Sequence, residues 1–113
     1  MPKKTAYSAQ IEYIQVMDEH GEVDPALARG LLDDQEILAL YQFMVECRQL
    51  DEIAFKLQRS GRMGTYPQNK GQEAAAIGTA YAAKKGQDFL VPCYRENAAL
   101  FMHGLPMHYV LLH

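Results

Sequence analysis

The sequence predicts a mainly α-helical fold with a short β component, and three observations support this class. An apolar pattern of helical period extends over residues 33–60, an alanine-rich helix is expected over 71–83, and the apolar run 89–91 has the composition of a short buried strand. Helices that alternate with a strand are typical of a parallel α/β layer. With 113 residues, 49% of them hydrophobic, the chain is expected to form one domain at most.

Residues 1–32 are expected to form an extended N-terminal arm, ahead of a domain that begins at residue 33 and continues to 113. Apolar and polar residues alternate imperfectly over 8–17, residues 18–21 (DEHG) predict a turn, and residues 22–25 could form a short returning strand. A ribbon of two strands is only marginally stable alone. We therefore expect the arm to pair only within a larger assembly.

The long helix is expected to begin at Asp33, because Glu36 stands three residues later as in a capping box, and to end at Gly61. Arg48 and Asp51 lie on its apolar face, where leucines would be usual. We expect them to form a buried pair that also bonds to a neighbouring loop; the alternative is a solvated pair near a bend. Neither is expected to be catalytic. The apolar residues of this face are Ile37, Leu40, Tyr41, Met44, Val45 and Phe55.

A loop over 59–70 and the alanine-rich helix follow. Tyr66 is expected to be extended because it precedes a proline. The helix over 71–83 carries small residues on every side, so it is expected to be buried between neighbours. Glu73 lies in its first turn, where the helix dipole favours an acid, or else it orients the nearby loop.

The segment 91–96 (VPCYRE) places a phenol and a guanidinium side by side after the predicted strand. A helix is expected from about Arg95 to His103, closing at Gly104, with Pro106 opening the next. A guanidinium at a helix start, beside free backbone N–H groups, suits a phosphate ester. Tyr94 and Arg95 are therefore the strongest candidates for binding a ligand.

Charge and cysteine content narrow the possible partners. Eleven basic and fourteen acidic residues give a net charge of −3 without a basic stripe, so no nucleic acid is expected. No apolar run approaches the ~20 residues of a membrane span, so no membrane association is expected. Cys47 and Cys93 lack metal-ligand spacing and are expected to be free thiols of a reduced cytoplasm.

Four motifs, taken in order and with their spacing, resemble the alpha subunit of thiamine-diphosphate-dependent 2-oxoacid dehydrogenases. They are 48–51 (RQLD), 57–67 (LQRSGRMGTYP), 71–75 (GQEAA) and 88–96 (DFLVPCYRE). The resemblance extends from about residue 13 to the last residue and covers the N-terminal third of the family's subunit. It implies that residues 33–113 are the truncated start of an α/β thiamine-diphosphate-binding domain, and that the chain is an inactive fragment.

The resemblance also implies a cofactor, partners and roles for individual residues. Family members decarboxylate a 2-oxoacid on thiamine diphosphate and pass the acyl group to a lipoyl arm. They form an alpha–beta heterotetramer that works with a lipoyl acyltransferase core. Tyr94 and Arg95 match the pair that contacts the cofactor diphosphate, whereas the Mg²⁺ ligands are expected beyond residue 113. Tyr66 is the candidate on the substrate side; otherwise it packs at the alpha–beta contact.

The loop 61–66 (GRMGTY) is more similar to the pyruvate type of bacterial subunits than to the branched-chain type. A prokaryotic, cytoplasmic pyruvate dehydrogenase subunit is therefore expected. Pro67 departs from variants that carry a histidine near this place, so no substrate-binding histidine is carried over. Branched-chain 2-oxoacid or acetoin dehydrogenase remains an alternative, as does a non-enzymatic helical binding module in which Tyr94 and Arg95 merely begin a helix.

Overall fold

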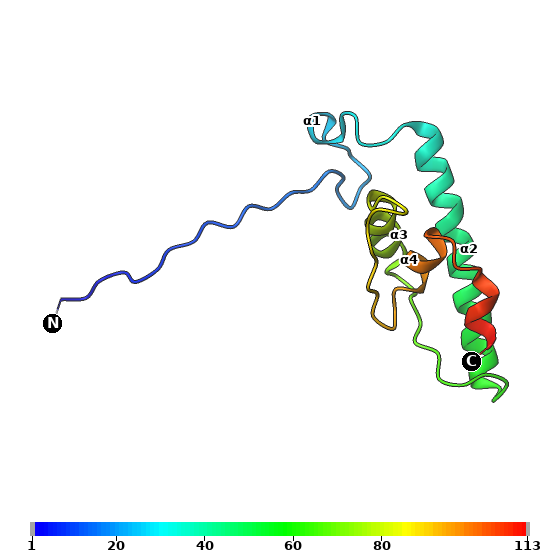
Figure 1. The fold of residues 1–113 in the computed structure, drawn as a ribbon. Helices are drawn as coiled ribbons and strands as arrows, with labels where there is room; N and C mark the ends of the chain where they lie inside the picture. Colours follow the sequence, from blue (N-terminus) through cyan, green and yellow to red (C-terminus); the bar gives the residue numbers. More distant parts are fainter. Residues whose placement is uncertain (1, 113) are drawn as a thin grey trace. The chain divides into compact units, whose positions relative to one another are not determined.

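The computed structural model describes residues 2–112, and these are predominantly helical, as predicted (Figure 1). The chain divides into two units, Met1–Asp33 and Asp34–His113. The first contains the short helix α1. The second contains α2, α3, α4 and a terminal 3-10 helix, and it holds every candidate site residue.

A turn and a single β bridge organise the first unit. Met17 and Val23 form an isolated antiparallel bridge. Between them, the Asp18 carboxylate accepts hydrogen bonds from the backbone N–H groups of His20 and Glu22, at 2.8 and 2.9 Å. The turn predicted at 18–21 is confirmed. The returning strand is reduced to this bridge, which is the sole β pairing within residues 2–112.

Helix α1 (Pro25–Ala28) was not predicted from the sequence. Asp24 caps it, because its Oδ1 accepts from the N–H groups of Ala26 and Leu27 at 2.8 and 3.1 Å. Pro25 occupies the first turn, where a missing N–H does no harm. Asp24 and Pro25, the last two residues of the predicted strand 22–25, therefore cap and begin a helical turn instead.

Helix α2 (Asp34–Arg59) begins directly after Asp33 and ends close to the predicted stop. Gly61 adopts a φ of 69°, a left-handed conformation that glycine tolerates without steric cost. Its N–H donates to the Gln58 carbonyl (3.0 Å), and the Arg62 N–H donates to the Leu57 carbonyl (2.9 Å). These two bonds form a Schellman motif, which confirms Gly61 as the cap.

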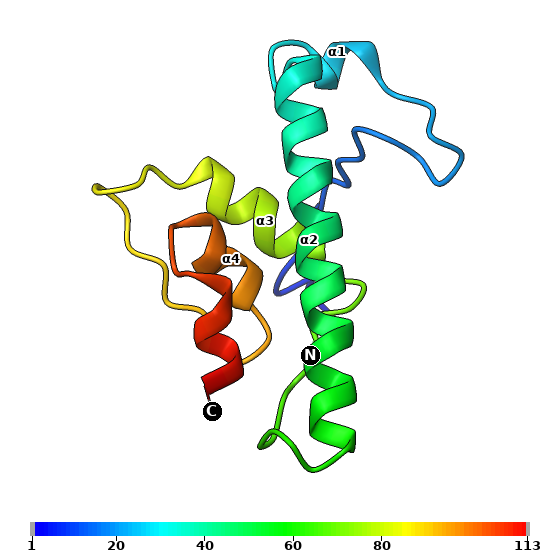
Figure 2. The same ribbon diagram turned by 90° about the vertical axis from the view of Figure 1, so that its right-hand side faces the viewer.

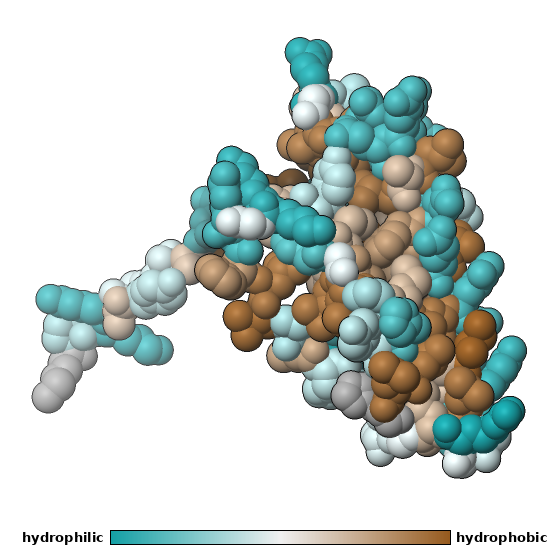
Figure 3. Space-filling view, turned by 45° about the vertical axis from the view of Figure 1, so that its right-hand side comes forward, coloured by the Kyte–Doolittle hydropathy of each residue, from teal (hydrophilic) through white to brown (hydrophobic). Residues whose placement is uncertain are grey.

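The buried face of α2 differs from the predicted one. Tyr41 is 64% exposed, and Ile37 and Val45 are also exposed. Hydrophobic side chains consequently reach the surface beside polar ones (Figure 3). Leu40 and Asp51 of the predicted face are buried, but the rest of the buried stripe is shifted toward Cys47 and Ala54. The buried residues of this stripe are Leu40, Cys47, Asp51 and Ala54.

Helix α3 (Glu73–Ala82) contacts both α2 and α4, and it lies beside α2 in both ribbon views (Figures 1 and 2). Ala76, Ile77 and Ala80 are its buried apolar residues, and Ile77 is fully buried. Burying such a side chain stabilises the fold by about 1.5–3 kcal/mol. The opposite face of α3 is exposed, so the expectation of burial on every side is not met: α2 and α4 cover one face only.

The predicted strand at 89–91 is not formed. Phe89 is 95% and Val91 92% exposed, while Leu90 alone packs against the core. A strand needs a neighbour for its backbone N–H and C=O groups, and no segment among residues 2–112 pairs with this one.

Helix α4 (Asn97–Met102) starts two residues later than predicted and ends at a second Schellman motif. The Gly104 N–H donates to the Phe101 carbonyl at 2.9 Å, and the Leu105 N–H donates to the Leu100 carbonyl at 3.0 Å. Met107–Leu112, after Pro106, is a 3-10 helix. Of the helices within residues 2–112, none is both long and apolar enough to cross a membrane.

Candidate functional site

A buried carboxylate on α2 organises the loop that precedes α3. Asp51 is 2% exposed. Its Oδ1 accepts the Tyr66 hydroxyl at 2.9 Å and the Asn69 backbone N–H at 2.7 Å, and its Oδ2 accepts the Gln68 side-chain amide at 3.3 Å. Three donors from one loop therefore converge on a single side chain. This is the bond to a neighbouring loop that the sequence predicted for Asp51.

The predicted partnership of Arg48 with Asp51 is wrong. The Nε of Arg48 donates to Glu73 on α3, and the other Glu73 oxygen accepts the Gly71 N–H at 3.0 Å. Asp51 already has three donors, whereas Glu73 is buried and needs a cation. The bond from Arg48 holds the pKa of Glu73 below its usual value against the opposing effect of burial. Glu73 thus joins α2 to the start of α3 and fixes the loop end at Gly71.

Tyr66 lies at the centre of the loop, and its side chain is buried. Burial raises the pKa of its phenol, and the hydrogen bond to Asp51 raises it further. The hydroxyl is therefore protonated at neutral pH and acts as a donor to Asp51. Tyr66 is also one of the residues that line a neighbouring cavity.

That cavity, the Tyr66 pocket, brings together two of the sequence candidates. Tyr66 and the exposed Tyr94 both line it, and its volume is about 360 Å³. The loop, α4 and the terminal 3-10 helix supply its walls. The lining residues are Met63, Thr65, Tyr66, Pro67, Tyr94, Asn97, Leu100, Leu105, Tyr109 and Val110.

Arg95 lies in the turn before α4 rather than in the helix itself, contrary to the predicted start at this residue. Its guanidinium carbon is 5.3 Å from the centre of the Tyr94 ring, and its Nη1 donates to the Gln68 carbonyl at 2.8 Å. The side chain is exposed. A guanidinium carries five N–H donors, so donors remain for a phosphate group while one holds the loop.

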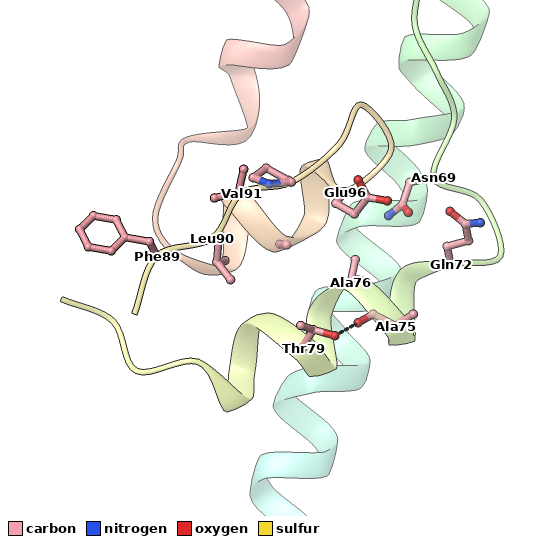
Figure 4. A pocket seen from close by; sticks show the side chains of 11 residues that line it. Asn69, Gln72, Ala75, Ala76, Thr79, Phe89, Leu90, Val91 and Glu96 are labelled. Carbon is pink, nitrogen blue, oxygen red and sulfur yellow. Dashed lines mark hydrogen bonds between the residues drawn. The ribbon is translucent and has the colours of Figure 1, made fainter. Parts of the chain in front are cut away.

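A second cavity, the Asn69 pocket, lies between α3 and the extended segment 89–92 (Figure 4). Its volume is about 510 Å³, and Phe89 lies at one end with Asn69 and Glu96 toward the other. Asn69 Oδ1 and Glu96 Oε2 are buried there and have no hydrogen-bond partner within residues 2–112. Sequence reasoning missed both residues, because a lone Asn in a polar loop and an acid before a helix are common.

The two cysteines are free thiols in different environments. Cys47 is buried on α2, and burial raises its pKa to about 11, with a smaller contribution from Glu46. Cys93 is exposed. Residues 2–112 contain no group of three His, Cys, Asp or Glu side chains that could hold a metal ion.

Comparison with known proteins places this geometry in context. The family model described as the dehydrogenase E1 component matches residues 41–113. Similar proteins include the pyruvate dehydrogenase E1 component subunit alpha of Bacillus cereus, 37% identical over 95% of this chain, and that of Bacillus subtilis, 40% identical over 87%. The Staphylococcus aureus protein of the same name is 35% identical over 88% of this chain. The chain spans only 26–29% of the length of these relatives.

Proposed function

Since the chain belongs to the dehydrogenase E1 component family, we propose that it is the N-terminal part of the alpha subunit of a 2-oxoacid dehydrogenase acting on pyruvate. The observation that carries this proposal is the match over residues 41–113, which includes Tyr66, Tyr94 and Arg95. Relatives at 35–40% identity carry the name pyruvate dehydrogenase, and this favours pyruvate over a branched-chain 2-oxoacid.

In this proposal Tyr94 and Arg95 contact the diphosphate of thiamine diphosphate. Both side chains are exposed, and Arg95 retains N–H donors beyond the one given to Gln68, which fits a charged phosphate ester. The bound cofactor supplies the decarboxylation chemistry, while the protein supplies binding and orientation. Tyr66 remains the candidate for the substrate side, because it lines the Tyr66 pocket together with Tyr94.

The complete enzyme is proposed to contain further parts. A beta subunit completes an alpha–beta heterotetramer, a lipoyl acyltransferase core accepts the acyl group, and the Mg²⁺ ligands lie outside residues 1–113. Residues 1–113 alone are therefore expected not to decarboxylate a 2-oxoacid. The location is proposed to be the cytoplasm of a prokaryote, since the three relatives compared are bacterial.

Arg95→Ala tests the proposal in the complete alpha subunit assembled with its beta partner. Each charge-assisted hydrogen bond contributes about 1.5–3 kcal/mol, so the half-saturating concentration of thiamine diphosphate should rise about tenfold or more. Turnover at saturating cofactor should change little by comparison. Arg95→Lys should recover only part of the affinity, because an ammonium cannot reproduce the planar fork.

Arg62→Ala is the matched control, since Arg62 is an exposed arginine of the neighbouring loop and is expected to leave half-saturation unchanged. Tyr94→Phe removes one hydroxyl and should weaken cofactor affinity less than Arg95→Ala. An unchanged half-saturation in a folded Arg95→Ala enzyme would contradict the proposal and favour a structural role for the 94–95 turn.

A further inference from the structure

We propose that Asp51 is a positioning residue that sets the place of the Arg95 guanidinium through a single peptide unit of the loop. The inference rests on the proposed function, in which Arg95 meets the cofactor diphosphate. Asp51 and Arg95 share no direct bond. They are joined by the peptide group between Gln68 and Asn69, which each of them contacts from its own side.

The first contact fixes the N–H of that peptide. The Asn69 N–H donates to Asp51 Oδ1 at 2.7 Å, and both residues are buried. Asp51 belongs to the middle of a 26-residue helix, so its carboxylate is held on a rigid element. The Tyr66 hydroxyl reaches the same oxygen and holds the loop at a second point.

The second contact uses the C=O of the same peptide. Arg95 Nη1 donates to the Gln68 carbonyl at 2.8 Å. A trans peptide is planar, and its N–H and C=O point in opposite directions, so fixing the N–H on Asp51 also fixes the direction of the C=O. The carboxylate additionally polarises the peptide, because hydrogen bonds in a chain strengthen one another, and makes the Gln68 carbonyl a better acceptor for a cation.

The consequence is a preorganised cation. Arg95 has a flexible side chain, yet it is restrained by the Gln68 carbonyl and by the Tyr94 ring. Ordering a side chain before its ligand arrives removes part of the entropic cost of binding. Loss of the Asp51 contact should let the peptide rotate, so that the Arg95 guanidinium adopts many orientations, while the helices themselves remain in place.

Nuclear magnetic resonance of the 113-residue chain tests this inference. The Arg95 Nε–Hε group reports the order of the guanidinium through its heteronuclear NOE, and titration with inorganic pyrophosphate reports binding. Asp51→Ala should lower the NOE and raise the pyrophosphate dissociation constant about fivefold or more. In Asp51→Asn the NOE and the pyrophosphate dissociation constant should both stay near their wild-type values, because the amide oxygen can occupy the Oδ1 position that accepts the Asn69 N–H. Glu52→Gln, on the same helix but part-exposed, should match the wild type.

An Arg95 group that is as ordered in folded Asp51→Ala as in the wild type would overturn the inference. If Asp51→Ala does not fold, Asp51→Ser is measured instead, because the serine hydroxyl is one bond too short to reach the loop. An Arg95 group that is as ordered in Asp51→Ser as in the wild type would also overturn the inference. A third outcome is possible: Arg95 is less ordered in Asp51→Ala than in the wild type, but adding pyrophosphate does not shift the resonances of the wild-type chain. This result would support the positioning role of Asp51 and contradict the proposed diphosphate contact.

Discussion

Replacing Asp51 with alanine should strongly destabilise the second unit, for a reason that differs from the loss of an ion pair. The substitution removes the acceptor of two buried donors, the Tyr66 hydroxyl and the Asn69 N–H. The third donor, the Gln68 amide, is half-buried and its contact is longer, at 3.3 Å, so it can turn toward water.

The magnitude follows from the two buried donors. Leaving a buried donor unsatisfied costs about 1–3 kcal/mol, so Asp51→Ala should reduce the free energy of unfolding by about 2–6 kcal/mol. Asp51→Asn should cost about 1 kcal/mol, because both buried bonds use Oδ1 and an amide oxygen can replace it. The large difference between two substitutions that both remove the charge separates hydrogen bonding from electrostatics.

Urea denaturation followed by far-ultraviolet circular dichroism measures these differences. Glu52→Gln is the control: its partner Lys70 is exposed, and an exposed pair contributes below about 1 kcal/mol. The reasoning is refuted if Asp51→Ala lies within about 1 kcal/mol of the wild type, or if Asp51→Asn is as destabilising as Asp51→Ala.

Two further predictions concern titrating groups. Because Arg48 holds the folded-state pKa of Glu73 below 4.5, Glu73 stabilises the fold at neutral pH and this contribution is lost as the pH falls through that lowered value. The difference in unfolding free energy between wild type and Glu73→Gln should therefore shrink as the pH is lowered below 4.5 and through that lowered pKa, and a constant difference in urea melts would contradict it. With its pKa raised to about 11 and its thiol buried, Cys47 should resist iodoacetamide at about pH 8 until denaturant is added, whereas Cys93 reacts at once. Mass spectrometry of the alkylated chain shows which thiol reacted, and equal labelling would argue against burial of Cys47.

Local signals in the sequence predicted the ends of helices well. Gly61 and Gly104 each permit the left-handed backbone that closes a Schellman motif, and that requirement depends on a few adjacent residues. The turn at 18–21 was equally local, since the Asp18 carboxylate bonds within four residues. The motif that contains Tyr94 and Arg95 likewise pointed to residues that the structure leaves exposed.

Long-range partners were less accessible to sequence reasoning. The periodicity of α2 allowed several neighbouring stripes to be the buried one, and the choice depends on what α3 and the loop bring to it. Arg48 and Asp51 are correctly spaced to pair with each other, but Glu73 competes for the cation from 25 positions away. The segment 89–91 has strand composition, yet a strand requires a pairing neighbour, and none exists within residues 2–112.

The link between Asp51 and Arg95 marks a different boundary of sequence reasoning. Tyr66 and Arg95 could be nominated from their side chains, because a phenol and a guanidinium have recognisable chemistry. The group that joins Arg95 to Asp51 is the peptide between Gln68 and Asn69, and a backbone N–H and C=O occur at nearly every position. This peptide group matters because the loop orients its N–H toward Asp51 and its C=O toward Arg95. A substitution at Asp51 is therefore expected to alter the placement of Arg95, 44 positions later in the sequence (95 − 51), although the two side chains share no direct bond.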